Sequence, residues 1–410
     1  MSAIAQNTSA YFIDLEEAHG AHNYHPLPVV LSKGEGVFVW DVDEKKYYDF
    51  LSGYSAVNQG HCHPRIVEAF TQQARRLTLT SRAFYNDQLG VFEKFITQLL
   101  GYDKVLPMNT GVEAVETALK LCRKWAYEVK GVTEDEAVII VCEQNFHGRT
   151  TTVISFSSDP SSKKNFGPFT GGFVRIPYND LQALETALQQ KNVAGFLVEP
   201  IQGEAGVIVP DAGYLSAAKK MCTDANVLFI ADEIQTGLCR TGYMLACDEE
   251  KVRPDIVLLG KALSGGMMPV SAVLADDEIM LTIKPGEHGS TYGGNPLAAV
   301  TAIASLQVLI DEDMAQQALE LGAYFRGQLE ALASPHIRTI RGKGLLNAIE
   351  IKASDPDAAW NLCLEMMRNG LLAKPTHGDK IRFAPPLCIT RAQLDECISI
   401  IEASLTLLDA

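Results

Sequence analysis

The sequence lacks an excess of basic residues, a paired-cysteine motif and a long apolar run. Lys and Arg number 35 against 50 Asp and Glu, which gives a formal net charge of −15. Such an acidic balance disfavours nucleic acids and anionic membranes as partners. Nine cysteines are scattered without a C-x-x-C pair, a pattern typical of buried thiols in a reducing compartment. These absences argue against nucleic-acid-binding, membrane and disulfide-stabilised classes.

The N-terminal region also lacks the features of a targeting segment. The first 20 residues contain no Lys or Arg and no apolar core, so we expect neither a signal peptide nor a transit peptide. No apolar stretch reaches the roughly 18–20 residues that a membrane-spanning helix needs. We therefore expect a soluble, cytoplasmic protein without a membrane partner.

Apolar residues are abundant and are arranged in short runs between helical patterns. Of 410 residues, 47% are hydrophobic, enough to bury a large core. Apolar positions recur at helical spacing over residues 112–126. Strands that are apolar on both faces and alternate with helices predict a mostly parallel sheet covered on both sides, an α/β fold. The expected strands are 137–141, 195–199, 227–231, 255–259 and 271–275.

The same patterns divide the chain into three parts. Residues 1–50 are predicted to form an N-terminal arm and a β-hairpin, "GVFVWDVDEKKYYDF", that packs with the C-terminal part. Residues 51–295 are predicted to form the large domain. Residues 296–410 are predicted to form a smaller α+β domain, which opens with a long helix at about 296–333.

Charged residues follow three of the expected strands. Glu199, Asp232 and Lys261 each come at or just after the end of an apolar run. In open α/β sheets, ligands bind at the carboxyl ends of the strands. A single strand-end charge is usually a surface residue, but three together favour a site.

Several chemistries do not account for these charges. Asp232-Glu233 resembles a Walker B element, but Asp255 stands where the first glycine of a phosphate-binding loop is required before Lys261. No G-x-G-x-x-G follows a strand. The segment 61–63, His-Cys-His, lacks a second cluster of ligands, so we expect a turn before a helix and no metal. A glycosidase-like carboxylate pair remains open by spacing, but it leaves the lysine unexplained.

Pyridoxal 5'-phosphate (PLP) accounts for the whole set. Its aldehyde needs a lysine with a lowered pKa, which desolvation gives Lys261. Its ring nitrogen needs an anion, which Asp232 supplies. Its phosphate needs a helix N-terminus with small residues, and Gly111 and Val112 open the most amphipathic helix pattern. Phe146, which follows an expected strand, offers an apolar plate for the ring.

Six motifs, in this order, resemble the class III, fold type I aminotransferases. The resemblance covers nearly the whole chain and implies a large domain with a mostly parallel sheet plus a smaller α+β domain. Four further segments resemble the ornithine-using members: "GAHNYHPLP", "LSGYSAVNQGH", "LTSRAFYN" and "LAKPTHGDKIRFAPPL". The six motifs are "MNTGVEA", "NFHGRT", "VEPIQGEAG", "ADEIQTGLCRTG", "LLGKALSGG" and "GSTYGGNPLA".

The resemblance implies a set of cofactor-binding residues. Lys261 binds the PLP aldehyde and carries protons, and Asp232 partners the ring nitrogen. Because one contact comes from a second subunit, the resemblance implies a homodimer or a larger assembly. The remaining implied contacts are Gln235 at the ring hydroxyl, Gly111 and Val112 at the phosphate, Phe146 against the ring, and Thr291 at the phosphate of the other subunit.

It also implies how substrates bind. Arg149 binds the distal carboxylate of 2-oxoglutarate and Arg382 its α-carboxylate. Glu204 pairs with Arg382, while Tyr24 and Tyr54 shape the ornithine pocket.

The implied reaction moves the δ-amino group of ornithine to 2-oxoglutarate, giving glutamate 5-semialdehyde and glutamate. Acetylornithine and 4-aminobutyrate remain alternative substrates. A silent PLP-binding regulator, a different class, would need a further DNA- or effector-binding segment, and the sequence shows no spare domain for one. His147 stands where some relatives carry Trp; both side chains are planar.

Overall fold

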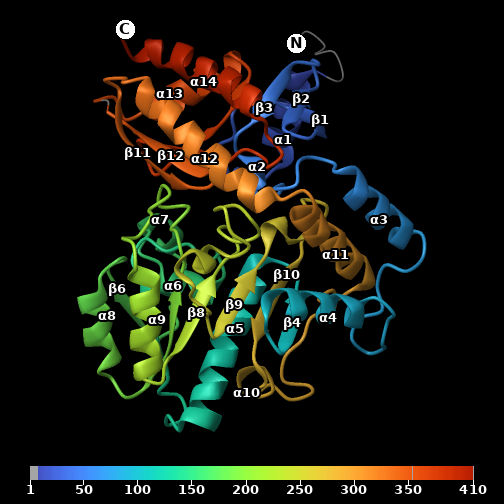
Figure 1. Cartoon of the computed structure of the whole chain (residues 1–410), viewed down its shortest axis with the longest axis vertical. Coiled ribbons are helices and arrows are strands. Elements are labelled where there is room, and N and C mark those ends of the chain that lie inside the picture. Colours follow the sequence, from blue (N-terminus) through green and yellow to red (C-terminus); the bar gives the residue numbers. More distant parts are fainter. Residues whose placement is uncertain (1–7, 353, 410) are drawn as a thin grey trace.

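The computed structural model describes residues 8–352 and 354–409, so the first seven residues of the predicted arm lie outside it. Figure 1 shows an upper body, which contains α1 (Ser9–His19) and α14 (Arg391–Leu405), and a lower body built on the largest sheet. Within the described residues, no helix is long and apolar enough to cross a membrane.

The lower body contains a seven-stranded sheet in the order β4-β10-β9-β8-β7-β5-β6. The five strands from β9 to β6 run parallel, whereas β10 is antiparallel to both β9 and β4. The predicted strands are confirmed to within two residues at each end. Their bounds are β4 Lys104–Met108, β5 Val138–Cys142, β6 Phe173–Ile176, β7 Val193–Val198, β8 Leu228–Asp232, β9 Ile256–Leu259 and β10 Ser271–Ala275.

Helices cover both faces of this sheet, as its doubly apolar strands require. On β5, Ile139 and Val141 join the apolar cluster under α5, whereas Ile140 and Cys142 join the cluster under α8 and α9. Successive strand residues point to opposite faces, so one strand contributes to both clusters. The covering helices are α5 Gly111–Trp125, α6 Thr151–Phe156, α8 Leu181–Leu188, α9 Tyr214–Asp224 and α10 Asp277–Met280.

A small sheet joins the beginning of the chain to its C-terminal third. The predicted hairpin is confirmed as β2 (Phe38–Asp41) and β3 (Lys46–Asp49), and β1 (Leu31–Glu35) pairs with β2. Strand β13 (Leu371–Leu372) adds to β3 in parallel. The N-terminal strands therefore lie in the upper body, beside the C-terminal helices (Figure 1).

The prediction of one helix over 296–333 is wrong. The structure has α11 (Pro296–Asp311) and α12 (Met314–Ala331), separated where Asp313 takes a left-handed conformation with φ of 49°. Asp tolerates this conformation better than most residues, so the break needs neither Gly nor Pro. Helix α11 packs against α3 (Pro64–Ala74) and α4 (Leu89–Leu100) in the lower body.

The rest of the upper body is a four-stranded antiparallel sheet, in the order β11-β12-β15-β14, with its helices. The strand β15 matters most here, because it carries Arg382 toward the lower body. The elements of the whole chain not given above are α2 Ser52–Ser55, α7 Pro160–Lys163, β11 Ile337–Lys343, β12 Leu346–Ile351, α13 Ala358–Arg368, β14 Lys374–Thr376 and β15 Lys380–Phe383. Short one-turn helices lie at Ala126–Lys130 (η1), Ala246–Glu250 (η2), Lys261–Ser264 (η3) and Thr406–Asp409 (η4).

Candidate active site

The three charged strand ends meet at one cavity. Strands β7, β8 and β9 are parallel neighbours, so their carboxyl ends reach the same edge of the sheet. Glu199, Asp232 and Lys261 all line a cavity of about 200 Å³ at this edge. The sequence-based expectation of a shared site at the strand ends matches this geometry.

Lys261 is half-buried and sits at a sharp change of backbone direction. Gly260 is extended, Lys261 has φ of 44°, and the one-turn helix η3 begins at the lysine. Left-handed φ values are unfavourable for side chains other than Gly and Asn, and they often occur at functional positions. Burial lowers the pKa of Lys261 more than the carboxylates of Glu204 and Asp232 raise it. A lysine that loses its proton more readily is a better nucleophile and proton carrier.

Asp232 is held from two sides. His147 Nδ1 lies 2.6 Å from its Oδ2, and the backbone N–H of Ile234 donates to its Oδ1 at 3.1 Å. Burial lowers the pKa of His147, but the hydrogen bond and charge of Asp232 outweigh burial and raise it. Sequence reasoning gave His147 no partner, because 85 residues separate it from Asp232 and no spacing rule links them.

Glu199 positions the neighbouring aromatic residue. The backbone N–H of Phe146 donates to Glu199 Oε1 at 2.9 Å, and burial raises the pKa of Glu199 to about 7. Phe146 is 37% exposed, and it lines this cavity and the adjoining one. The ring is thus available for contact with a planar ligand.

The N-terminus of α5 forms one wall of the cavity. Thr110 caps the helix in a capping box with Glu113, and Gly111 and Val112 line the cavity. The first N–H groups of a helix have no intrahelical acceptor, so they are available to an anion. Gly148 has φ of 123°, and a Cβ there would lie 2.4 Å from Val112 Cγ2. Only glycine lets the loop after Phe146 approach α5 this closely.

These residues fit PLP. The cavity offers a lysine with a lowered pKa for an aldehyde and a buried carboxylate for a ring nitrogen. It also offers a helix N-terminus for a phosphate and a half-exposed aromatic ring for a planar face. Each group of the cofactor has a chemically matched counterpart.

A second, outer cavity of about 380 Å³ adjoins the first. The two share Phe146, His147, Gly148 and Glu204 along their lining. The outer cavity also contains Arg149, whose guanidinium lies 5.4 Å from the centre of the Phe146 ring. Arg149 is exposed and makes no salt bridge with any residue that the structure describes.

The other predicted substrate arginine is already paired. Arg382 Nη1 lies 2.7 Å from Glu204 Oε1, and the side chains of this pair are 2% and 21% exposed. Gln235 Nε2 donates to the same Glu204 oxygen at 3.3 Å. The ring of Tyr54 lies 5.1 Å from the Arg382 guanidinium carbon. Because Arg382 comes from β15, this ion pair links the upper body to the strand ends of the lower one.

Four predicted residues line neither cavity: Arg382 and Tyr54, which contact each other beside Glu204, and Tyr24 and Thr291. Tyr24 is 73% exposed and lines neither. Thr291 is also exposed and lines neither, although its neighbour Ser290 accepts a hydrogen bond from Asn109 Nδ2 at 2.9 Å. Asn109 directly precedes Thr110, the cap of α5. Thr291 therefore lies near the N-terminus of α5, where a phosphate is expected, but it does not line the cavity of its own chain.

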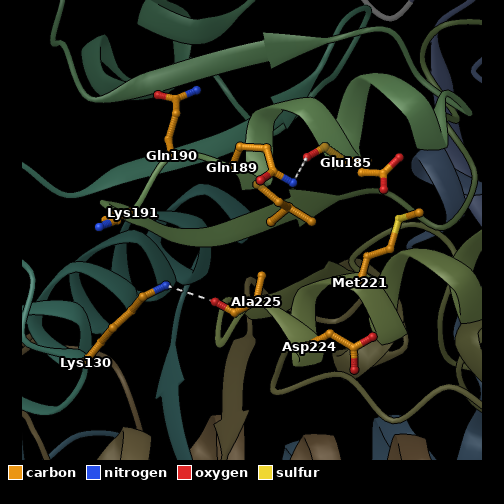
Figure 2. A pocket seen from close by; sticks show the side chains of 9 residues that line it. Lys130, Glu185, Gln189, Gln190, Lys191, Met221, Asp224 and Ala225 are labelled. Atoms are coloured by element: carbon orange, nitrogen blue, oxygen red, sulfur yellow. Dashed lines mark hydrogen bonds between the residues drawn. The ribbon is translucent and has the colours of Figure 1, made fainter.

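Another hollow, of about 550 Å³, lies at the opposite edge of the sheet (Figure 2). Its Lys130 donates to the backbone carbonyls of Val193 and Asn226, each at 2.6 Å, and to that of Ala225 at 3.5 Å. The lysine therefore caps the end of α9 and is committed to the backbone. Val193 begins β7, so this is the amino edge of the parallel strands, away from the charged ends.

The His-Cys-His segment takes part in the packing of the chain. His61 Nε2 lies 2.7 Å from Asp49 Oδ2, and His63 Nε2 lies 2.9 Å from Glu312 Oε1. Helix α3 begins directly after it, at Pro64, as expected. Across residues 8–352 and 354–409, no group of three or more His, Cys, Asp or Glu is placed to hold a metal ion.

Comparisons with known proteins show the family of the chain. The model of the class III aminotransferase family matches residues 19–405. Mitochondrial ornithine aminotransferase of Rattus norvegicus is 60% identical over 398 residues, 97% of this chain and 91% of the relative. Ornithine aminotransferase of Toxoplasma gondii, whose crystals show partial occupancy of PLP at the active site, has a TM-score of 0.97 at 50% identity and covers 98% of this chain and 95% of its own.

A further solved structure carries a different substrate name. Acetylornithine aminotransferase of Elizabethkingia anophelis is 60% identical, with a TM-score of 0.90 and coverage of 97% of this chain and 99% of its own. All three relatives are named as aminotransferases, and the two solved structures share the fold of this chain. The chain belongs to the class III aminotransferase family, whose members use PLP.

Proposed function

We propose that this enzyme transfers the δ-amino group of L-ornithine to 2-oxoglutarate. The observation that carries the proposal is the 2.7 Å ion pair between Glu204 and Arg382, beside an unpaired Arg149. With Arg382 masked, the α-carboxylate of ornithine docks at Arg149 in the outer cavity. The chain of ornithine then extends past Phe146, and its δ-amine reaches Lys261.

The second half of the reaction needs the opposite arrangement. 2-Oxoglutarate carries two carboxylates, one beside the reacting carbon and one at the far end. When Glu204 moves aside, Arg382 binds the near carboxylate and Arg149 the far one. One ion pair thus serves as a switch between two substrates of different length and charge.

The residues of the inner cavity have separate roles. A bound PLP would supply an electron sink for the charge that develops on the substrate carbon. Asp232, oriented by His147, holds a proton at the ring nitrogen. Lys261 Nζ removes the proton from the substrate carbon and returns it on the cofactor side, as a general acid–base. The first N–H groups of α5 hold the phosphate, and Gln235 contacts the ring hydroxyl.

A homodimer is part of the proposal. Thr291 lines neither cavity of its own chain, which supports a role at the phosphate of a partner subunit. Phe84, Tyr85 and Tyr292, the neighbour of Thr291, are large aromatic side chains that are exposed, and such residues favour a protein interface. Sedimentation of the active enzyme should show at least two subunits; a fully active monomer would contradict this.

The division of the chain is also proposed. We retain an arm and hairpin over 1–50, a large domain over 51–295 and a small domain over 296–410. The addition of β13 to the N-terminal strands supports packing of the arm with the small domain. Limited proteolysis that leaves 51–295 intact would support these boundaries; cleavage first within that range would contradict them.

The cytoplasm is the proposed compartment. Its support is the set of free cysteines, most of them buried, because a reducing compartment preserves thiols. Fractionation of the source cells tests this directly, with recovery in an organelle fraction as the contrary result.

Acetylornithine is the second candidate substrate, favoured by the 60% identity with the Elizabethkingia enzyme. The two candidates differ at the α-nitrogen, which is a free ammonium in ornithine and an amide in acetylornithine. Turnover should be measured with ornithine, acetylornithine and 4-aminobutyrate, each with 2-oxoglutarate. o-Aminobenzaldehyde traps the cyclised semialdehyde from ornithine. Faster turnover of either other amine would displace the proposal.

A further inference from the structure

The outer cavity contains one carboxylate that is not paired with a base. Among the described residues that line it, only Glu204 and Asp159 are acidic. Glu204 is bound to Arg382, whereas Asp159 makes no salt bridge within the described chain. Among the described residues, the Asp159 carboxylate oxygens accept hydrogen bonds only from the backbone N–H and hydroxyl of Ser161, each at 2.8 Å.

The basic residues of the same cavity show a similar contrast. Lys380 is paired with Asp379 at 2.7 Å, while Arg149 is unpaired. Within the part of the chain that the structure describes, the outer cavity therefore presents one cation and one anion without a salt bridge. The other titratable groups among the described residues that line it are His377 and His147, which is bonded to Asp232.

Asp159 and Arg149 are close enough to influence each other. Burial raises the pKa of Asp159, but the hydrogen bonds from Ser161 and the charges of Arg149 and His377 lower it further, so the net shift is downward. Asp159 is thus anionic at neutral pH. Asp159 and Arg149 line the same cavity but form no salt bridge with each other. Such a pair of opposite charges matches a ligand that carries an ammonium and a carboxylate on one carbon.

We propose that Asp159 binds the α-ammonium group of ornithine while Arg149 binds its α-carboxylate. This inference rests on the proposed function, because the zwitterionic end of ornithine reaches the outer cavity only when the δ-amine is at Lys261. Asp159 is then a specificity-determining residue. An acetylated α-nitrogen carries no charge and gains nothing from the carboxylate.

The other substrate of the cycle does not use Asp159. Glutamate and 2-oxoglutarate place only a carboxylate at the far end, where Arg149 receives it. Their binding is therefore independent of Asp159, or slightly opposed by its charge. Removing the charge should affect one half-reaction and spare the other.

Asp159→Asn is the variant that isolates the charge. Asp159 is the N-cap of α7, and Asn caps helices as well as Asp does. A matched control is Asp180→Asn, the same exchange at the N-cap of α8, where Asp180 accepts from the Ala183 N–H at 2.8 Å. Asp180 lines neither cavity of the site.

The test compares ornithine with 5-aminovalerate, the same chain without the α-ammonium group. Half-reaction rates of the PLP-loaded enzyme are measured by stopped flow. In Asp159→Asn we expect kcat/KM for ornithine to fall about tenfold or more, with 5-aminovalerate and glutamate changed less than about twofold. Asp180→Asn should leave all three substrates unchanged.

Two results would count against different conclusions. If the wild-type enzyme does not turn over ornithine, the proposed function fails. If it does, but Asp159→Asn leaves the ratio of ornithine to 5-aminovalerate unchanged, only the role of Asp159 is overturned. An equal loss for both amines would likewise overturn it, because a general disturbance of the cavity would then explain the effect.

Discussion

Removing Glu204 should shift the preference of the enzyme between its two amino donors toward glutamate. In the resting structure Arg382 is almost fully buried and is paired with Glu204 at 2.7 Å. Its Nε atom has no hydrogen-bond partner among the residues that the structure describes, and the next acceptor for Nη1 is Gln235 Oε1 at 3.5 Å. Without Glu204, the buried guanidinium therefore lacks a compensating anion and attracts the carboxylate of an incoming substrate.

The expected size of the change in preference follows from the electrostatic attraction between Glu204 and Arg382. Two unit charges ~4 Å apart attract by about 4 kcal/mol at an effective dielectric constant of 20. Glu204 is 21% exposed, so screening by solvent reduces the attraction to ~2 kcal/mol. That free energy corresponds to roughly a 30-fold change in an equilibrium constant. Glu204→Ala should therefore speed the glutamate half-reaction over the ornithine one by at least about tenfold. Some ornithine should also react through its α-amine.

Stopped-flow half-reactions with product analysis measure both effects. Glu204→Gln is the graded variant, because it keeps the side-chain volume and loses the charge. Glu249→Ala is the control, because it also removes an ion pair, the one between Glu249 and Lys343. Neither of these two residues lines either cavity of the site. An unchanged ratio of half-reactions, with semialdehyde as the only product from ornithine, would refute the switch.

Three further predictions concern the inner cavity. Borohydride should attach a pyridoxyl group to the peptide that contains Lys261, and Lys261→Ala should lose transamination by several orders of magnitude while still binding PLP; label on another lysine would exclude the assignment. Asp232→Asn should weaken PLP binding and nearly abolish turnover, so near-normal activity would show that Asp232 is only a strand-end charge. Glu199, with a folded pKa of about 7 against an unfolded value of 4.5, should lower the free energy of unfolding by on the order of 3 kcal/mol as pH rises from 4.5 to 7. Glu199→Gln should flatten that part of the stability curve, measured by denaturant titration, and an unaltered slope would contradict the reasoning.

Local patterns predicted the strands and the position of the site. Apolar runs mark buried strands, and parallel neighbours end at the same edge, so Glu199, Asp232 and Lys261 were expected to lie together. The direction of β10 was beyond this reasoning, because an apolar run has the same appearance in either orientation. The break at Asp313 was missed for a related reason, since no Gly or Pro marks it.

Contacts between distant segments were the least predictable part of the site. The contact of His147 with Asp232 depends on how the whole fold places the loops. The same holds for the pairing of Glu204 with Arg382, which leaves Asp159 as the unpaired carboxylate of the outer cavity among the described residues. The role of Tyr24 at the substrate stays a prediction of the resemblance. The resemblance implied a place in the substrate pocket, and in the structure its side chain is largely exposed and lines neither cavity.

The parallel pairing of β3 with β13 delays completion of the small sheet during synthesis of the chain. Tyr48 pairs with Leu371, so the edge of β3 lacks its neighbour until more than 300 further residues have been translated. At ~5–20 residues per second, that interval lasts roughly 15 to 65 seconds. For this time a strand rich in tyrosine has an open edge, the kind of surface on which nascent chains associate. The hairpin is therefore where a chaperone is most needed, and where substitutions would reduce yield before they affect the catalytic rate.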